Sequence, residues 1–436
     1  MYRRSLPMSG AAVPAALAAL AAVGWHAASI PQRQCGPLAH EAYVWQRDWT
    51  GAVSAAAIAA GREGRFARLV VLTAEAAFPR GASRPQVVRV RPDYAALRRC
   101  GAPVGLAIRV GPYAGTFAPD APATEALADL TDSVVRGAAR EGLGASEVQI
   151  DFDCAESRLD GYALWLRAVR RRIAPTPLTF TALPCWLDRP AFARLAASAD
   201  GFVLQVHSLH RPRAGRAVLC DPHEARRAVE RAAAFARPFR VALPTYGYLV
   251  AFDRAGRLLG LSAEGPAPRW PVEARVELAE ADAGEMAAMV RCWTADRPAH
   301  MRGIIWYRLP VEGDRLNWPA ATLSAVTAGS APRAALAARA RRAAPGLVEI
   351  VLANVGQADT RGQVRVSVAW GGEAVLAADA LGGFRLAGGD AGTLRLAGRV
   401  GPGAWPLPPG RQCPVAWIRF ARDTEVQTHV QIAPIP

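Results

Sequence analysis

A short stretch near the middle of the chain, residues 148–153 within the sequence EVQIDFDCAE, alternates strictly between apolar and polar side chains. The apolar residues are Val148, Ile150 and Phe152, and the polar residues are Gln149, Asp151 and Asp153. Because a β-strand sends successive side chains to opposite faces, one face is apolar and the other carries carboxylates. Helical patterns precede the stretch (residues 124–141) and follow it (159–173), which indicates a strand buried under helices. In a barrel of parallel strands, the polar face points at the axis and ends at the active-site mouth.

Strand-like segments of this kind alternate with helical patterns over residues 36–330. The predicted strands are residues 42–49, 68–75, 104–110, 147–156, 178–183, 200–207, 239–246 and 301–308. This order predicts an α/β protein with a (β/α)8, TIM-like barrel. Between the last two strands, residues 249–278 contain a hairpin pattern and a further strand. This insertion either lines the barrel mouth or is a peripheral addition with no role in the site.

The pattern changes near residue 346, after which short alternating segments are separated by Gly-rich turns. Residues 346–436 therefore predict a small all-β, sandwich-like domain. The Ala- and Arg-rich residues 331–345 are predicted to be a helix or linker. We expect this domain to pack rigidly against the barrel, and a glycan-binding role stays open because a fold alone does not assign a function.

The N-terminus combines a basic start with an apolar run to about residue 23, which is typical of a secretory signal peptide. Since no clean small-x-small cleavage site follows, residues 1–34 are predicted to be a signal peptide or an uncleaved anchor. The protein is expected to be periplasmic or secreted. Any membrane contact is expected through this segment alone, because no other stretch is long and apolar enough to span a bilayer.

The net charge of +15 and the pI of about 10.4 allow a nucleic acid or an anionic surface as a partner. However, all 52 basic residues are Arg, they are scattered, and no basic stripe carries interleaved aromatic residues. We therefore predict no nucleic-acid binding. The seven cysteines have no C-x-x-C spacing, so we expect neither a metal nor a cofactor. Cys154 and Cys185 follow neighbouring strands and either form a disulfide, which export would permit, or remain free thiols.

In each strand, either the odd-numbered or the even-numbered side chains face the barrel axis. One such choice for each strand brings polar and aromatic residues together at the barrel mouth. The candidate catalytic residues are Asp151, Asp153, Glu156 and Glu75. The candidate substrate-binding residues are Trp45, Arg47, Arg109, Trp186, Gln205, His207, Tyr246, Trp306 and Arg308. In one interpretation, two carboxylates act as general acid and base on a glycosidic bond while aromatic faces stack on sugar rings. In the other, the carboxylates form ion pairs with Arg47, Arg109 or Arg308 in a structural polar layer. The position at the mouth favours a ligand site.

The sequence QIDFD at residues 149–153 resembles the Asp-x-Asp-x-Glu signature of chitinase-type glycoside hydrolases, which are (β/α)8 barrels. In that pattern the terminal Glu protonates the leaving oxygen, and the second aspartate, here Asp153, orients the substrate's acetamido group. The place of the acid is taken by Ala155, and Glu156 stands one residue later. Trp306 and Tyr246 also resemble the sugar-binding platform of that family.

A closer resemblance covers residues 42–318. The segments YVWQR, QIDFD, ALPCW and QVH are similar to an uncharacterised bacterial family of exported barrel proteins. We expect an exported glycoside hydrolase-like protein that acts on or binds a polysaccharide, with Asp153 or Glu156 as the acid and Asp151 and Glu75 in support. The alternative is a non-catalytic carbohydrate-binding or envelope-assembly protein with a degenerate active site. The substrate sugar, the linkage and the oligomeric state stay open.

Overall fold

The computed structural model describes residues 32–209, 218–263, 268–360, 362–400 and 407–433. The predicted signal peptide or anchor falls almost entirely on residues 1–31, outside the described residues. Among the described residues, no helix has the length and apolarity needed to cross a membrane. All seven cysteines are free thiols, so Cys154 and Cys185 are not joined by a disulfide.

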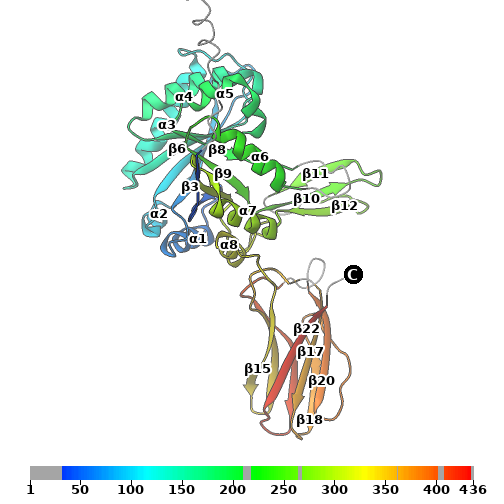
Figure 1. Ribbon diagram of the computed structural model, residues 1–436. Coiled ribbons are helices and arrows are strands. Elements are labelled where there is room, and N and C mark those ends of the chain that lie inside the picture. Colours follow the sequence, from blue (N-terminus) through cyan, green and yellow to red (C-terminus); the bar gives the residue numbers. More distant parts are fainter. Residues whose placement is uncertain (1–31, 210–217, 264–267, 361, 401–406, 434–436) are drawn as a thin grey trace, which may run out of the picture.

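Eight parallel strands close into a barrel, as predicted (Figure 1). Each strand pairs with the next in chain order, and the last pairs with the first. The barrel strands are β2 (Ala39–Val44), β3 (Arg68–Ala77), β5 (Val104–Val110), β6 (Ala145–Phe152), β7 (Leu178–Ala182), β8 (Gly201–Gln205), β9 (Phe239–Pro244) and β14 (Met301–Tyr307). The predicted segments lie within a few residues of these bounds.

Helices surround the barrel. They are α1 (Gly51–Arg62), α2 (Tyr94–Cys100), α3 (Pro122–Arg140), α4 (Leu159–Ile173), α5 (Pro190–Ala196), α6 (Pro222–Ala233), α7 (Ala283–Ala295) and α8 (Ala320–Thr327). Their starts follow local chemistry: the Asp221 and Asp282 side chains accept backbone N–H bonds at the beginnings of α6 and α7. Proline occupies the first turn of α3, α5 and α6, where its missing N–H is not needed.

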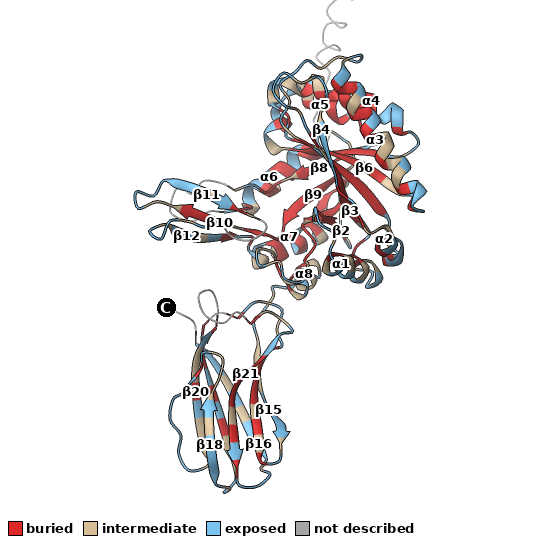
Figure 2. Ribbon diagram, turned by 180° about the vertical axis from the view of Figure 1, so that it is seen from behind, coloured by how far each residue is buried: buried red, intermediate tan, exposed pale blue. Residues whose placement is uncertain are grey.

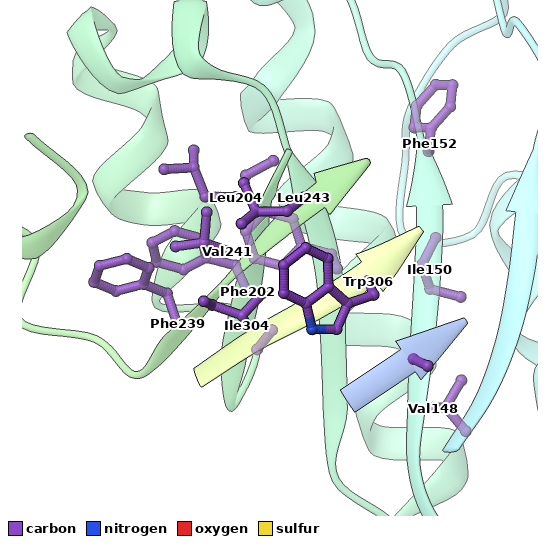
Figure 3. Packing of buried hydrophobic residues seen from close by; sticks show 14 of the residues in the cluster. Val148, Ile150, Phe152, Phe202, Leu204, Phe239, Val241, Leu243, Ile304 and Trp306 are labelled. Carbon is purple, nitrogen blue, oxygen red and sulfur yellow. The ribbon is translucent and has the colours of Figure 1, made fainter. Parts of the chain in front are cut away.

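The apolar side chains of the barrel strands point outward and pack against these helices. In β6, Val148, Ile150 and Phe152 are fully buried in this layer, as the alternation predicted (Figure 3). Figure 2 shows that the strands are buried along most of their length while the outer sides of the helices are exposed. The polar residues that alternate with this apolar set therefore face the barrel axis.

Shorter strands extend the barrel. β4 (Gln86–Arg89) pairs antiparallel with β3, and β1 (Arg33–Gln34) pairs with β13 (Arg297–Pro298). The insertion after β9 forms an antiparallel sheet of β10 (Gly247–Phe252), β11 (Leu258–Ser262) and β12 (Arg275–Glu280), which projects from the barrel (Figure 1).

The C-terminal part forms two four-stranded antiparallel sheets around a second apolar core. One sheet contains β15 (Leu336–Ala344), β16 (Leu347–Asn354), β21 (Gln412–Phe420) and β18 (Val375–Ala380). The other contains β19 (Arg385–Leu386), β20 (Thr393–Val400), β17 (Gly362–Trp370) and β22 (Val426–Ala433). The prediction of a helix or linker over residues 331–345 is wrong. Residues 336–344 form an edge strand that pairs with β16, and Leu336 and Ala338 pack on the core.

Candidate active site at the barrel mouth

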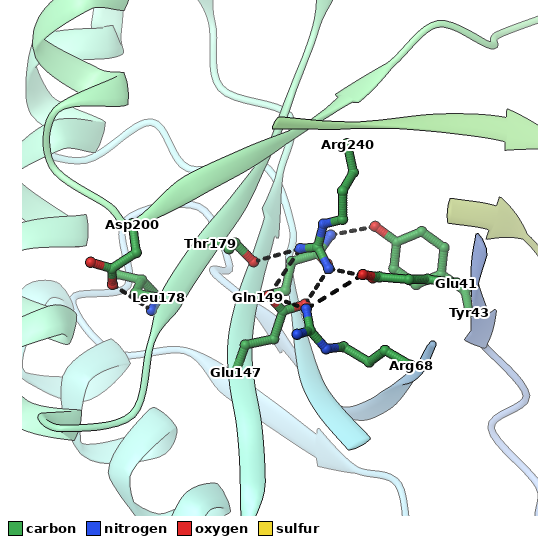
Figure 4. A network of polar contacts seen from close by, with 9 residues as sticks. All are labelled: Glu41, Tyr43, Arg68, Glu147, Gln149, Leu178, Thr179, Asp200 and Arg240. Atoms are coloured by element: carbon green, nitrogen blue, oxygen red, sulfur yellow. Dashed lines mark hydrogen bonds and ion pairs between the residues drawn. The ribbon is translucent and has the colours of Figure 1, made fainter. Parts of the chain in front are cut away.

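The lower part of the barrel interior contains a buried network of charges (Figure 4). The Arg240 guanidinium on β9 donates to both carboxylate oxygens of Glu147 at 2.7 and 3.0 Å, and also to Glu41. Arg68 lies 3.1 Å from Glu147 and 3.6 Å from Glu41, so two arginines balance two carboxylates. Burial lowers the pKa of Arg240, but Glu147 and Glu41 raise it on balance, so Arg240 stays charged. This network is complete in itself and leaves no charge for the mouth above it.

An apolar layer separates the charged network from the mouth. Its buried members are Tyr43, Val70, Leu72, Ala107, Val203, Ala242 and Ile305, with Trp45 at its upper edge. A bulge in β3 between Leu72 and Ala74 changes the parity of this strand. As a result, Leu72 packs inside the barrel and Glu75 also reaches the interior higher up. This layer excludes water from the region directly below the barrel mouth.

Above this layer, the C-terminal ends of the strands enclose an open cavity of about 450 Å³. We call it the cup. Its described lining residues are Tyr43, Trp45, Arg47, Arg109, Asp151, Asp153, Thr181, Gln205, His207, Ala242, Tyr246, Tyr248, Ala263 and Tyr307. Tyr248 lies on β10 and Ala263 follows β11, so the insertion contributes to the mouth and is not merely decorative.

Asp151 and Asp153 lie on the same face of β6 in unlike surroundings. The Thr181 hydroxyl on β7 donates to the Asp151 carboxylate at 2.7 Å. Burial raises the pKa of Asp151 to about 6, and the nearby Asp153 adds to this effect, while Thr181 and Arg109 oppose it. Asp153 is exposed, and among the described residues it has no ion-pair partner. One carboxyl group therefore keeps its proton up to about pH 6, and a second stands beside it in contact with solvent.

Glu75 and Arg47 form a bidentate ion pair at the rim. The guanidinium donates to both carboxylate oxygens at 2.8 and 2.9 Å. The expectation that Glu75 meets an arginine is thus confirmed, and its carboxylate is not part of the cup lining. Arg109 stands in register between Glu75 and Asp151 on the neighbouring strands, where its charge acts on Asp151. The rim therefore holds Glu75 as a partner of Arg47.

An aromatic cluster forms one side of the cup. Tyr307 stacks on His207 with ring centroids 5.7 Å apart, and its edge contacts Tyr43, Trp45 and Tyr246 at 5.4–5.7 Å. The Tyr246 hydroxyl lies 3.4 Å from His207 Nδ1. Burial lowers the pKa of His207 to about 3, so this imidazole is neutral at physiological pH. The cluster offers rigid apolar faces rather than charge.

Besides Glu75, four residues expected at the mouth do not line the cup among the described residues. Glu156 lies in a short 3-10 helix beyond β6, where Arg189 donates to it at 2.5 Å. Trp186 is fully buried and packs against Tyr162 outside the barrel. Trp306 is also fully buried, faces the helices (Figure 3), and donates from Nε1 to His40 at 3.1 Å.

Arg308, the fourth of these residues, is buried and bound to Asp314 at 2.5 and 3.1 Å. The predictions that Trp306 and Arg308 line the cup are wrong for one reason. The structure turns β14 so that Gly303, Ile305 and Tyr307 point inward, the opposite parity to the one predicted. Tyr307 was therefore missed, although its position between two candidates was the available signal. The remaining predicted residues that line the cup are Trp45, Arg47, Arg109, Gln205, His207 and Tyr246 together with both aspartates.

The cup has the composition of a site for a small organic ligand. In the described part of the chain, no group of three or more His, Cys, Asp or Glu residues is placed to hold a metal ion. Rigid aromatic faces with a few convergent polar groups are typical of small-molecule and sugar sites.

Residues 108–312 match the family model described as "Domain of unknown function (DUF3142)". This part of the barrel is therefore similar to that domain of unknown function. It runs from the end of β5 to just beyond β14 and contains both aspartates, Thr181 and Tyr307, whereas Tyr43, Trp45 and Arg47 precede it. The resemblance to an uncharacterised barrel family is thus confirmed over this segment. No curated protein is significantly similar in sequence to this chain.

Solved structures with a similar barrel include a chitinase from Chromobacterium violaceum, at 15% identity and a TM-score of 0.46, covering 67% of this chain and 98% of that one. The spore cortex-lytic enzyme SleL of Bacillus cereus is 13% identical with a TM-score of 0.47, covering 68% of this chain and 75% of that one. SleL of Bacillus megaterium is 12% identical with a TM-score of 0.45, covering 64% and 72%. At these values, none of the likenesses bears on the activity of this chain.

Proposed function

We propose that the cup binds a glycan and that Asp151 and Asp153 act as an acid–base pair on a glycosidic bond. The observation that carries this proposal is the unlike environment of two carboxylates on one strand face. Asp151 is half-buried above a largely apolar layer with a pKa of about 6, and Asp153 is exposed beside it. Glycosidases separate the roles of two carboxyl groups by such differences in surroundings.

The spacing of the two residues suits this chemistry. The Cα atoms of positions i and i+2 of a strand lie about 6.6 Å apart, and rotation of the side chains sets the carboxyl separation around this value. Catalytic carboxyl pairs of glycosidases are separated by about 5–9.5 Å, and the shorter separation accompanies covalent catalysis. Asp151 would donate its proton to the leaving oxygen, and Asp153 would serve as base or stabilise the cationic transition state.

The surroundings support a sugar as the ligand. Trp45, Tyr246 and Tyr307 present ring faces or edges to a cavity of about 450 Å³, and apolar rings suit the C–H faces of sugars. Gln205 and Arg109 add hydrogen-bonding groups to the same lining. The predicted export segment supports action on a polysaccharide outside the cytoplasm, and cell fractionation of the full chain tests that part of the proposal.

A second candidate function is glycan binding without hydrolysis. The observation that favours it is that Ala155 stands where the resembling signature has its acid, while the neighbouring Glu156 is held by Arg189 away from the cup. In this case the carboxylates would accept hydrogen bonds from sugar hydroxyls and would transfer no proton.

One set of variants separates these functions. Wild type, D151N and D153N are incubated with a panel of soluble polysaccharides, while calorimetry measures binding and a reducing-end assay measures hydrolysis. A hydrolase loses at least about a hundredfold of its rate in either variant but keeps affinity. A binding protein releases no reducing ends in any form. The control is E224Q, which removes an exposed carboxylate on α6 that does not line the cup. Absence of glycan binding by wild type would refute both functions, and so would binding and hydrolysis that are both unchanged in D151N and D153N.

A further inference from the structure

The sheet β19-β20-β17-β22 of the C-terminal domain exposes a face that carries four arginines. In β17, Val364, Val366 and Val368 are fully buried in the second core, so the residues between them point to solvent. The exposed arginines of this face are Arg365 on β17, Arg385 on β19, and Arg395 and Arg399 on β20. Figure 1 shows β22, β17 and β20 side by side in this domain. We call this surface the arginine face.

The strand register arranges the four arginines around one small residue. Ala397 on β20 pairs with Arg365 on one side and with Arg385 on the other. Arg395 and Arg399 stand two residues before and after Ala397 on its own strand. Neighbouring strands lie about 4.8 Å apart and i, i+2 residues about 6.6 Å apart. The four arginine side chains therefore surround Ala397, whose methyl group is the only side-chain atom at the centre.

The charges of this face are nearly uncompensated. Arg395 lies 3.4 Å from Asp390, and both side chains are largely exposed. Among the described residues, Arg365, Arg385 and Arg399 have no ion-pair partner. Since like charges on neighbouring strand positions repel, this arrangement lowers the stability of the free domain. An anion bound at the centre would remove that cost.

The abundance of arginine in the chain does not explain the cluster. On the other sheet of the same domain, Arg341 stands opposite Glu349 and forms an ion pair with it. Asp379 stands two strands further along the same row. That sheet therefore mixes both signs of charge, whereas the arginine face segregates one.

We propose that the arginine face binds an anionic polysaccharide, whose carboxylate or sulfate groups lie among the four guanidinium groups around Ala397. A guanidinium donates two parallel hydrogen bonds to such groups. The flanking exposed residues are Gln363, Ser367, His429 and Gln431, which are suited to sugar hydroxyl groups. The described part of this face carries no Trp, Tyr or Phe on which nucleic-acid bases stack, so it fits a polysaccharide better than a single-stranded nucleic acid.

This site is separate from the cup and does not depend on the function proposed for it. The test measures binding of the full chain to polygalacturonate and to dextran sulfate by calorimetry. Each polymer is compared with its uncharged counterpart, methyl-esterified polygalacturonate and dextran. We expect binding to a charged polymer and none to its uncharged counterpart, with affinity that falls as salt rises. A preference between the two charged polymers identifies the carboxylate or the sulfate as the ligand group.

The variant R365Q/R385Q removes the two arginines that flank Ala397 across the sheet. It should bind about tenfold more weakly, because two charge-assisted contacts are lost at an exposed site. The control R339Q/R419Q removes two charges from the other sheet and should bind like wild type. Thermal unfolding should show that R365Q/R385Q is at least as stable as wild type without ligand, which excludes a folding defect. D151N should also bind the polymer like wild type.

Three results would overturn the proposal. An equal loss in R339Q/R419Q would mean that net charge alone attracts the polymer. Tighter binding to DNA than to either charged polysaccharide would assign the face to nucleic acid, and tighter binding to anionic lipid vesicles would assign it to a membrane surface. If D151N loses glycan binding in the cup but still binds the anionic polymer, only the proposal for the cup is affected. Failures of the two proposals are therefore distinguishable.

Discussion

The buried carboxyl group of Asp151 should make the barrel less stable as pH rises. Its pKa is raised to about 6 in the folded protein from an ordinary value of 3.8. Below about pH 3 both states are largely protonated and the group contributes almost no penalty. Between these values the folded state binds more protons than the unfolded state, so stability falls as pH rises through 6. The difference between the two pKa values corresponds to about 3 kcal/mol at pH 8.

The substitution D151N isolates this effect. An amide oxygen can still accept the Thr181 hydroxyl hydrogen bond but carries no charge. The side chain is partly exposed to the cup, so solvent reduces the expected gain at pH 8 to about 1–3 kcal/mol. At pH 4 the two proteins should differ by less than about 0.5 kcal/mol. Urea unfolding, followed by tryptophan fluorescence that reports largely on the barrel, measures both values and cancels effects that do not depend on pH.

Two neighbouring variants test the causes of the shift in opposite directions. T181V removes a hydrogen bond to the ionised carboxylate, so it should raise the pKa of Asp151 and move the loss of stability to higher pH. D153N removes a like charge and should move the loss to lower pH. A D151N variant that is no more stable than wild type at pH 8, relative to pH 4, would refute the reasoning. Shifts of the same sign in T181V and D153N would do so as well.

Three further substitutions separate the layers of the barrel. R240M should lower the free energy of unfolding by about 3–5 kcal/mol, because it leaves buried carboxylates poorly compensated. The control R194Q, in an exposed ion pair, should lower it by less than about 1 kcal/mol. Equal losses of the two variants in urea unfolding would argue against a buried network. W306A should cost about 3–5 kcal/mol through the cavity that it leaves in the outer layer, yet calorimetry of the folded variant should show unchanged glycan affinity. E156Q should bind and cleave glycans like wild type, because its carboxylate is held outside the cup, and a hundredfold loss of rate would return it to the catalytic site.

The barrel was predictable because its signals are local and repeated. Alternation of period two in β6 and the helical patterns around it repeat along the chain with short connections, and few architectures satisfy that order. The edge strand β15 was missed because Ala and Arg favour helices and because one row of backbone bonds to β16 fixes it. That pairing depends on residues that the local sequence does not reveal.

The site was only partly predictable because the parity of a strand is a tertiary property. The end of β14 reads Ile304-Ile305-Trp306-Tyr307, so either parity places one apolar and one aromatic residue inside the barrel. Packing against the helices decided for Trp306 on the outside and Tyr307 in the cup. In β3, a bulge breaks the alternation after Leu72, and no residue pattern announces it. The aspartates were placed correctly because β6 is regular and only one of its faces is apolar.

The order of the layers inside the barrel explains why Asp151 differs from Asp153. The charged network around Arg240 is neutral as a whole and lies below the apolar layer, so its arginines are not available to hold a carboxylate of the cup. Above that layer, the Thr181 hydroxyl is the single hydrogen-bond donor that the described residues provide for the Asp151 carboxylate. One hydrogen bond does not repay the loss of water, so the proton stays on Asp151 at a pH where an ordinary aspartate has lost it. Asp153 stands one step higher on the same strand face and keeps its solvent. The difference between the two carboxyl groups therefore arises from the depth of two positions on one strand face and not from a charged partner of either residue.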